Sequence, residues 1–197
     1  PNSPVFDLNV PKTCAKCHSN SKLMSRYGLP SNQFEEYKQS YHGQQLLENH
    51  NLNAANCADC HGTHGATPPG VKEVANVCGN CHALTEDYFN RGPHKNAVEK
   101  TGRPRCVDCH GNHKITFPEV SMFSGQAKGH CGSCHPASAP AGLIAANLSS
   151  LISSFEGRAA EIEAAIGDLK KSGLDLSLLE EKTKELKTKV IEAIPIA

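Results

Sequence analysis

The chain has 197 residues, of which 38% are hydrophobic and 5% aromatic, and it contains no tryptophan. This composition is thin for a conventional side-chain core. Basic and acidic residues are balanced at 20 each, so no nucleic-acid partner is predicted. The sequence has no run of 18 apolar residues, so no transmembrane segment is predicted either.

All ten cysteines belong to one motif, C-x-x-C-H, which occurs five times. Two cysteines separated by two residues and followed by histidine are typical of covalent c-type haem attachment. The sulfurs form thioethers to the porphyrin, and the adjacent imidazole binds one axial face of the iron. The sequence therefore predicts five covalently attached haems and their iron. The predicted attachment residues are Cys14, Cys17, Cys57, Cys60, Cys78, Cys81, Cys106, Cys109, Cys131 and Cys134, and the predicted proximal ligands are His18, His61, His82, His110 and His135.

Two other cysteine chemistries compete with haem. Seventeen residues lie between the pairs Cys57/Cys60 and Cys78/Cys81, a spacing that fits a zinc ribbon. An oxidising compartment would also permit disulfides. Neither chemistry requires a histidine after every second cysteine, so the pattern favours haem. Haem would then supply most of the core up to residue 140.

The N-terminal third is predicted from its prolines and its apolar spacing. Pro1, Pro4 and Pro11 indicate an extended arm over residues 1–13, directly before the first haem motif. Loosely helical spacing of apolar residues predicts one helix over 32–49, starting near Ser31. This helix would carry His42.

The composition changes after Pro140, where cysteine and histidine no longer occur. Apolar residues at steps of three and four predict one long amphipathic helix that ends before Gly173, a residue suited to a left-handed cap. The capping box from Ser177 to Glu180 predicts the start of a second helix, antiparallel to the first. The predicted stripe of the first helix is Ile144, Leu148, Leu151, Phe155, Ala159, Ile162, Ile166 and Leu169.

The predicted fold is therefore mostly irregular and α-helical, with almost no β structure. A haem-cored cytochrome c domain spans 1–140, and the helical hairpin spans 141–197. The first domain contains an internal duplication, because residues 41–82 recur at 93–135 with offsets of 49 to 53 residues.

Six histidines remain as candidates for the second axial ligands of five irons. His64 and His113 each follow a proximal histidine by three residues, which is too short a segment to reach the opposite face of the same porphyrin. Each is therefore predicted to serve a neighbouring haem. The predicted distal set is His42, His64, His94, His113 and His130, with His50 as a weaker candidate. Met122 is an alternative ligand, and Met24 is expected to pack against porphyrin.

Residues 41–135 resemble a family of bacterial multihaem c-type cytochromes. The matching stretches are SYHGQQLL, CADCHGTHGATPPGVKEVANVCGNCHA, YFNRGPHKNAV, CVDCHGNHKITFP and CGSCH. The resemblance implies that His42, His94, His64 and His113 are distal ligands. Related proteins often carry a further histidine beyond the helical tail, and no histidine follows His135 here. The distal ligand of the haem at Cys131 is therefore left open between His130, Met122 and a residue of another subunit.

The expected function is single-electron transfer along closely spaced, mainly bis-histidine haems, with no catalytic residue. We expect a secreted protein whose signal peptide is absent from this chain, located in the periplasm or outside the cell. Redox proteins or extracellular acceptors are its expected partners, and self-association into an oligomer or a cytochrome filament is a second expectation. The alternatives are a haem reductase and a redox sensor domain.

Overall fold

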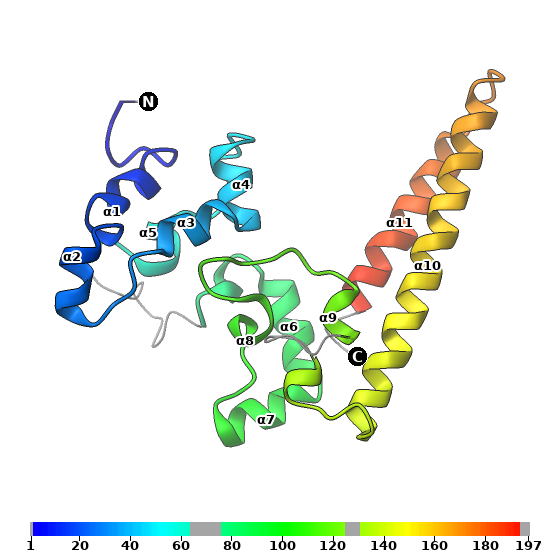
Figure 1. Ribbon diagram of the computed structural model, residues 1–197. Helices are drawn as coiled ribbons and strands as arrows, with labels where there is room; N and C mark the ends of the chain where they lie inside the picture. The colour runs from blue at the N-terminus through cyan, green and yellow to red at the C-terminus, as the bar shows by residue number, and fades with distance from the viewer. Residues whose placement is uncertain (1, 64–75, 125–130, 194–197) are drawn as a thin grey trace. The chain divides into compact units, whose positions relative to one another are not determined.

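A computed structural model describes residues 2–63, 76–124 and 131–193 (Figure 1). These residues form helices joined by irregular segments, and no strand occurs among them. This confirms the predicted fold class. The chain forms two compact units, Pro1–His82 with Pro104–Pro118, and Ala83–Arg103 with Glu119–Ala197. The predicted division of the sequence at residue 140 stays a prediction.

The first unit consists of short helices. Helix α1 contacts α2, α3 and α5, and α3 contacts α4. The elements of this unit are α1 (Val10–His18), α2 (Ser21–Met24), η1 (Ser25–Tyr27), α3 (Gln33–Lys38), α4 (Tyr41–Leu47), α5 (Cys57–His61), η3 (Cys78–Asn80) and α8 (Cys106–His110).

The N-terminal segment is more ordered than the sequence predicted. Helix α1 begins at Val10, so the prediction of an extended arm up to residue 13 was wrong. Pro11 lies in the first turn of α1, where proline's missing amide hydrogen costs no helical hydrogen bond. Thr13 also donates a hydrogen bond to the carbonyl of Pro4 at 2.9 Å, which ties the preceding turns to the helix.

The single helix predicted over 32–49 is two helices, α3 and α4, with a break between them. The break is made by Ser40, whose extended backbone and side chain cap α4. Ser40 Oγ accepts a hydrogen bond from the amide of Gly43 at 2.9 Å and donates one to the carbonyl of Tyr37 at 2.7 Å. Serine is a preferred N-cap residue, so a serine at this position marks the start of a new helix. The apolar spacing continues through this break, so spacing alone did not reveal it.

The second unit holds two helices around residues 83–101 and a long hairpin. Helix α10 contacts α9, η4 and α11, and α6 contacts α7. The elements of this unit are α6 (Ala83–Arg91), α7 (His94–Thr101), α9 (Ser121–Ser124), η4 (Cys131–Ser133), α10 (Pro140–Lys170) and α11 (Ser177–Ala193).

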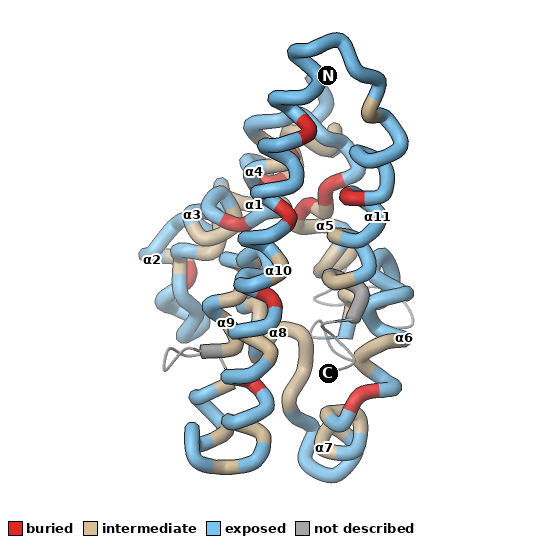
Figure 2. The backbone as a smooth tube through the Cα atoms, turned by 90° about the vertical axis from the view of Figure 1, so that its right-hand side faces the viewer, coloured by how far each residue is buried: buried red, intermediate tan, exposed pale blue. Residues whose placement is uncertain are grey.

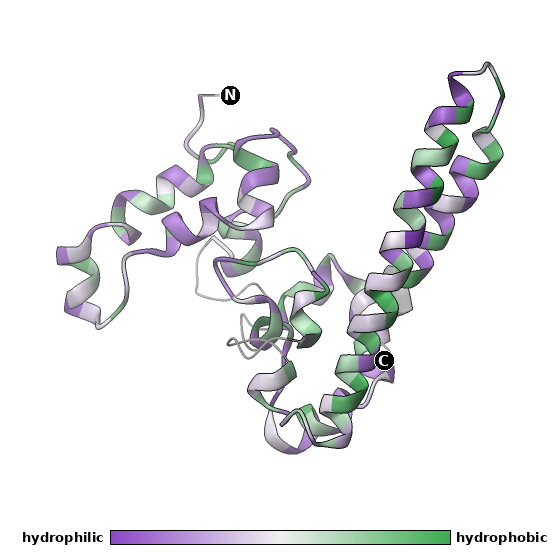
Figure 3. Cartoon of the chain, turned by 45° about the vertical axis from the view of Figure 1, so that its right-hand side comes forward, coloured by the Kyte–Doolittle hydropathy of each residue, from purple (hydrophilic) through white to green (hydrophobic). Residues whose placement is uncertain are grey.

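The two long helices form the predicted antiparallel hairpin. Lys170 Nζ lies 2.7 Å from Glu180 Oε1, and Lys187 Nζ lies 2.8 Å from Glu163 Oε1. A step of seven residues back along α10 thus matches a step of seven forward along α11. Figure 3 shows that α10 is mostly hydrophobic in its first half, where no charged residue occurs between Pro140 and Phe155.

The buried face of α10 is narrower than the predicted stripe. Its buried residues, Ala145, Ile152, Ala159 and Ile166, recur every seven positions. Only Ala159 and Ile166 belong to the predicted stripe, whereas Ile144, Leu151, Ile162 and Leu169 are exposed. Helix α11 lies opposite the part of this seam around Ala159 and Ile166, and α10 also contacts α9 and η4. The covered surface is narrow, because two packed helices touch along a single line.

The turn between α10 and α11 follows the prediction in part. Gly173 adopts the predicted left-handed conformation with φ +83°. Helix α11 begins at Ser177 as predicted, but Ser177 does not form the predicted capping box with Glu180, whose Oε1 accepts a hydrogen bond from Lys170. Asp175 Oδ1 instead accepts a hydrogen bond from the amide of Ser177 at 3.1 Å.

Side chains bury little of this protein. Across the described ranges the buried hydrophobic residues are Met24, Leu46, Ala54, Ala145, Ile152, Ala159 and Ile166, and three of these seven are alanine. Figure 2 shows the buried residues of all types as short, separated segments of the chain. So sparse a core agrees with the expectation that a bound group supplies apolar surface. No helix in the described part of the chain is both long and apolar enough to cross a membrane.

Candidate functional site

The cysteine motifs with aspartate at their third position each form one short helix. In α5, Asp59 Oδ2 accepts a hydrogen bond from the amide of Asn56 at 2.8 Å. In α8, Asp108 Oδ2 accepts one from the amide of Arg105 at 2.7 Å. These contacts form half of a capping box at each helix start. The aspartate of C-x-D-C-H therefore has a structural role that the sequence reading missed, although its recurrence in both copies was visible.

The glycine after each of these motifs reverses the chain. Gly62 has φ +74° and Gly111 has φ +80°, values that favour glycine because it lacks a Cβ. A Cβ on Gly111 would also lie 2.8 Å from the carbonyl oxygen of Lys114. The backbone directly after α8 therefore adopts a conformation that favours glycine, and the loop beyond it returns to α8, where the amide of Thr116 donates a hydrogen bond to the carbonyl of His110 at 3.1 Å.

The loop that follows Gly111 packs against the junction of α3 and α4. The amide of Tyr41 donates a hydrogen bond to the carbonyl of Ile115 at 2.9 Å, and the rings of Tyr41 and Phe117 lie 5.3 Å apart. Lys114 Nζ donates a hydrogen bond to Gln39 Oε1 at 2.9 Å. These contacts hold the loop against residues that lie about 75 positions earlier.

Three pairs of imidazole rings face one another in the described residues. The ring centroids are 6.0 Å apart for His42 and His82, and 6.0 Å for His61 and His113. In the second unit the rings of His94 and His135 are 6.2 Å apart. Each pair joins one histidine of a C-x-x-C-H motif to one predicted distal ligand.

The spacing of these pairs fits one metal ion held between two imidazoles. A metal–imidazole bond is about 2.0 Å, and about 1.1 Å more separates each nitrogen from its ring centre, so two axial rings lie about 6.2 Å apart. The residues present therefore fit haem iron with two histidine ligands, next to cysteines that can attach the porphyrin edge.

Burial favours the neutral form of four imidazoles in the described structure. Burial is the largest cause of the lowered pKa of His42, His94, His110 and His113. A neighbouring histidine lowers the pKa further at His42, His94 and His113. The neutral imidazole is the form that has a lone pair for a metal. Burial thus favours the metal-binding form of His42, His94 and His113, three of the predicted distal ligands.

The cysteines do not pair with one another. All ten lie in described segments, and none forms a disulfide. Burial raises the pKa of Cys57 to about 12, and its thiol lies within hydrogen-bonding reach of Cys14 from the preceding motif. Among the described residues no group of three or more histidine, cysteine or acidic side chains converges as a zinc ribbon requires.

The structure describes only some of the remaining predicted ligands. His64 and His130 lie outside the described residues. His50 is exposed with φ 52°, Met122 is half-buried on α9, and Met24 is buried. The ring that faces His135 is that of His94, which was not among the three alternatives left open for the haem at Cys131. Sequence repetition could have suggested this pair, because His42 and His82 match His94 and His135 across the duplication.

The helical fold and the facing imidazoles next to C-x-x-C-H motifs define a haem-binding electron-transfer class of protein. Residues 49–136 match the family model of Cytochrome c3, a match that covers somewhat under half of the chain and contains four of the five cysteine motifs. It supports a multihaem c-type cytochrome with covalently bound haem. No curated protein and no solved structure matches the chain.

Proposed function

We propose that this protein carries single electrons along five c-type haems with mainly bis-histidine ligation. The observation that carries the proposal is the spacing of 6.0 to 6.2 Å in three imidazole pairs, each of which includes one motif histidine. When bound, haem supplies the one-electron exchange between ferric and ferrous iron.

The chain's own residues prepare these sites for electron transfer rather than for catalysis. In each of the three pairs, both imidazoles would hold a bound haem iron and would leave it no open coordination site for a substrate. Because α5, α8 and the loop at 113–117 are held by hydrogen bonds, the ligands need not move when the charge of the site changes. Ligands that are already held in place lower the reorganisation energy of electron transfer.

We assign the haem at Cys57 to His61 and His113, that at Cys78 to His82 and His42, and that at Cys131 to His135 and His94. His64 and His130 are the proposed distal ligands for the haems at Cys14 and Cys106. Three histidines remain for these two haems, and His50 is left out of the assignment because it is exposed.

The proposed setting is the periplasm or the outside of the cell, where covalent haem attachment and respiratory electron exchange take place. Redox proteins or extracellular acceptors would be the partners. Self-association into an oligomer or filament is supported by exposed apolar residues in the outer part of the hairpin, Ile162, Leu169, Leu179 and Leu186. Electron microscopy of the purified protein tests this directly, because dispersed particles at high concentration would contradict a filament.

Haem number and spin state test the central proposal. Intact mass should show five haems per chain, and ferric spectra should show low-spin iron. The variants H42A, H94A and H113A should each convert one haem to the high-spin state and create one site that binds carbon monoxide. H50A is the comparison variant, because His50 is exposed and no other described ring faces it. Fewer than five haems, or a large high-spin fraction in the unmodified protein, would contradict the proposal and favour a reductase.

A further inference from the structure

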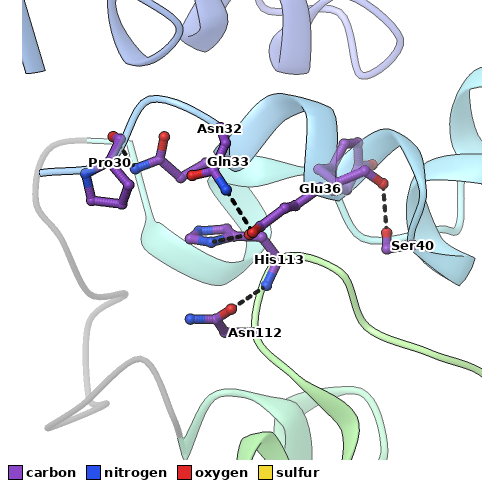
Figure 4. A network of polar contacts seen from close by, with 8 residues as sticks. Pro30, Asn32, Gln33, Glu36, Ser40, Asn112 and His113 are labelled. Atoms are coloured by element: carbon purple, nitrogen blue, oxygen red, sulfur yellow. Dashed lines mark hydrogen bonds and ion pairs between the residues drawn. The ribbon is translucent and has the colours of Figure 1, made fainter. Parts of the chain in front are cut away.

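A carboxylate lies against one of the proposed distal ligands. Glu36 on α3 places its Oε2 3.7 Å from Nδ1 of His113, as Figure 4 shows. The same carboxylate accepts a hydrogen bond from Asn32 Nδ2 at 2.7 Å through its other oxygen, Oε1. The side chains of His113 and Glu36 are 32% and 36% exposed, so water only partly screens this contact.

His113 is itself held from several sides. Its amide donates a hydrogen bond to Asn112 Oδ1 at 2.8 Å, and the loop beyond it is tied to Tyr41 through Ile115. A histidine that binds a metal through Nε2 retains Nδ1–H as a donor, and this donor commonly meets a carboxylate. Nδ1 is the atom of His113 that faces Glu36.

The contact is specific to one of the three facing pairs. In the described part of the structure, His42 and His94 lie near other rings and have no acidic side chain within ion-pair distance. Among the predicted distal ligands of the three pairs, His113 is thus the one with a carboxylate beside it in the described structure. A negative charge stabilises ferric over ferrous iron, because the oxidised site carries one more positive charge.

We propose that Glu36 is a positioning and tuning residue. It orients His113 through Nδ1 and lowers the reduction potential of the haem between His61 and His113. Asn32 holds the carboxylate in place. This inference rests on the proposed function, because it requires His113 to be an axial ligand.

The test compares two substitutions that each remove one negative charge from α3. E36Q removes the charge that faces His113. E35Q is the matched control, because Glu35 lies next to it in sequence but pairs with Lys38 Nζ at 2.7 Å and is 60% exposed. Both variants are examined in the full haem-loaded protein by redox titration followed with electron paramagnetic resonance, which resolves individual haems.

E36Q should shift the ferric–ferrous equilibrium of one haem about tenfold towards the reduced form, which is 59 mV for a one-electron couple. E35Q should shift it by less than about twofold, since an exposed charge is screened. Haem number and the low-spin spectrum should be unchanged in both variants.

Equal shifts in E36Q and E35Q would overturn the proposed role of Glu36. High-spin haem in E36Q would also overturn it, because a structural role would then account for the contact. The variant H113A separates this outcome from failure of the proposed function. If H113A leaves every haem low-spin, the ligand assignment itself is wrong, whereas a high-spin haem in H113A with no shift in E36Q removes only the role of Glu36.

Discussion

Substitution of Gly43 by alanine tests whether the α3–α4 junction sets the position of His42. Gly43 follows His42 directly and is buried against the end of α3. A Cβ at this position would lie 1.8 Å from the carbonyl oxygen of Tyr37 and 2.7 Å from its carbon. The carbonyl has little freedom to move, because it accepts hydrogen bonds from both the amide and the hydroxyl of Ser40.

The required displacement follows from these distances. Real Cβ atoms essentially never approach closer than 3.0 Å, so α4 must retreat from Tyr37 by at least about 1.2 Å. That distance is more than half of a metal–nitrogen bond of about 2.0 Å. His42 on α4 lies 6.0 Å from His82, centroid to centroid, and has no slack for such a movement. Overpacking of this kind costs about 1 to 3 kcal/mol of folding free energy.

We therefore expect G43A to convert one haem per chain to the high-spin state, with new carbon monoxide binding and a lower unfolding temperature. Optical and paramagnetic resonance spectra of the ferric protein measure the first effect, and thermal unfolding measures the last. G157A is the control, because a Cβ there meets nothing within 4 Å in α10 and should stabilise the helix by about 0.5 to 1 kcal/mol. A G43A protein with unchanged low-spin spectra and no carbon monoxide binding would refute the reasoning.

Three further substitutions should each lower the stability of the fold by an amount that can be measured. S40A removes the cap of α4 and should lower the unfolding free energy by about 0.5 to 2 kcal/mol in denaturant titration; an unchanged midpoint would contradict the capping role. Y37F removes the hydrogen bond to the carbonyl of Ala55 at 2.9 Å and should cost about 0.5 to 1.5 kcal/mol by the same measurement, whereas Y27F at an exposed ring should cost nothing. I166A creates a cavity at a buried position of the hairpin and should lower its local unfolding free energy by about 2 to 5 kcal/mol. Amide hydrogen exchange in α10 and α11 should then be faster, while the haem spectra stay unchanged. Equal exchange in I166A and the unmodified protein would show that this buried seam does not hold the hairpin together.

The sequence by itself determined the chemistry of this protein. The C-x-x-C-H motif is local, because two sulfurs and one imidazole within five residues meet the same porphyrin. The same holds for the glycine after His110 and for the left-handed Gly173, whose roles depend on the backbone of adjacent residues. The long hairpin also follows from local periodicity, which the helix repeat makes visible over many turns.

The break between α3 and α4 shows where local reasoning failed. The apolar spacing of residues 34–46 continues through the break, and only the buried hydroxyl of Ser40 and the close approach of Gly43 to Tyr37 reveal it. The narrow seam of α10 is a similar case. Periodicity identifies an apolar face, but the neighbouring helix decides which part of that face is covered.

Only the tertiary structure decided which distal histidine faces which motif. His42 lies 40 positions before its partner, His94 lies 41 before its own, and His113 lies 52 after His61. No local rule relates such positions, because the pairing depends on how the loop at 113–117 packs on the junction of α3 and α4 in one unit and on the fold around His94 in the other. The same packing brings Glu36 to His113. Sequence thus specifies which groups can bind iron, whereas long-range packing selects their partners and the charge that surrounds them.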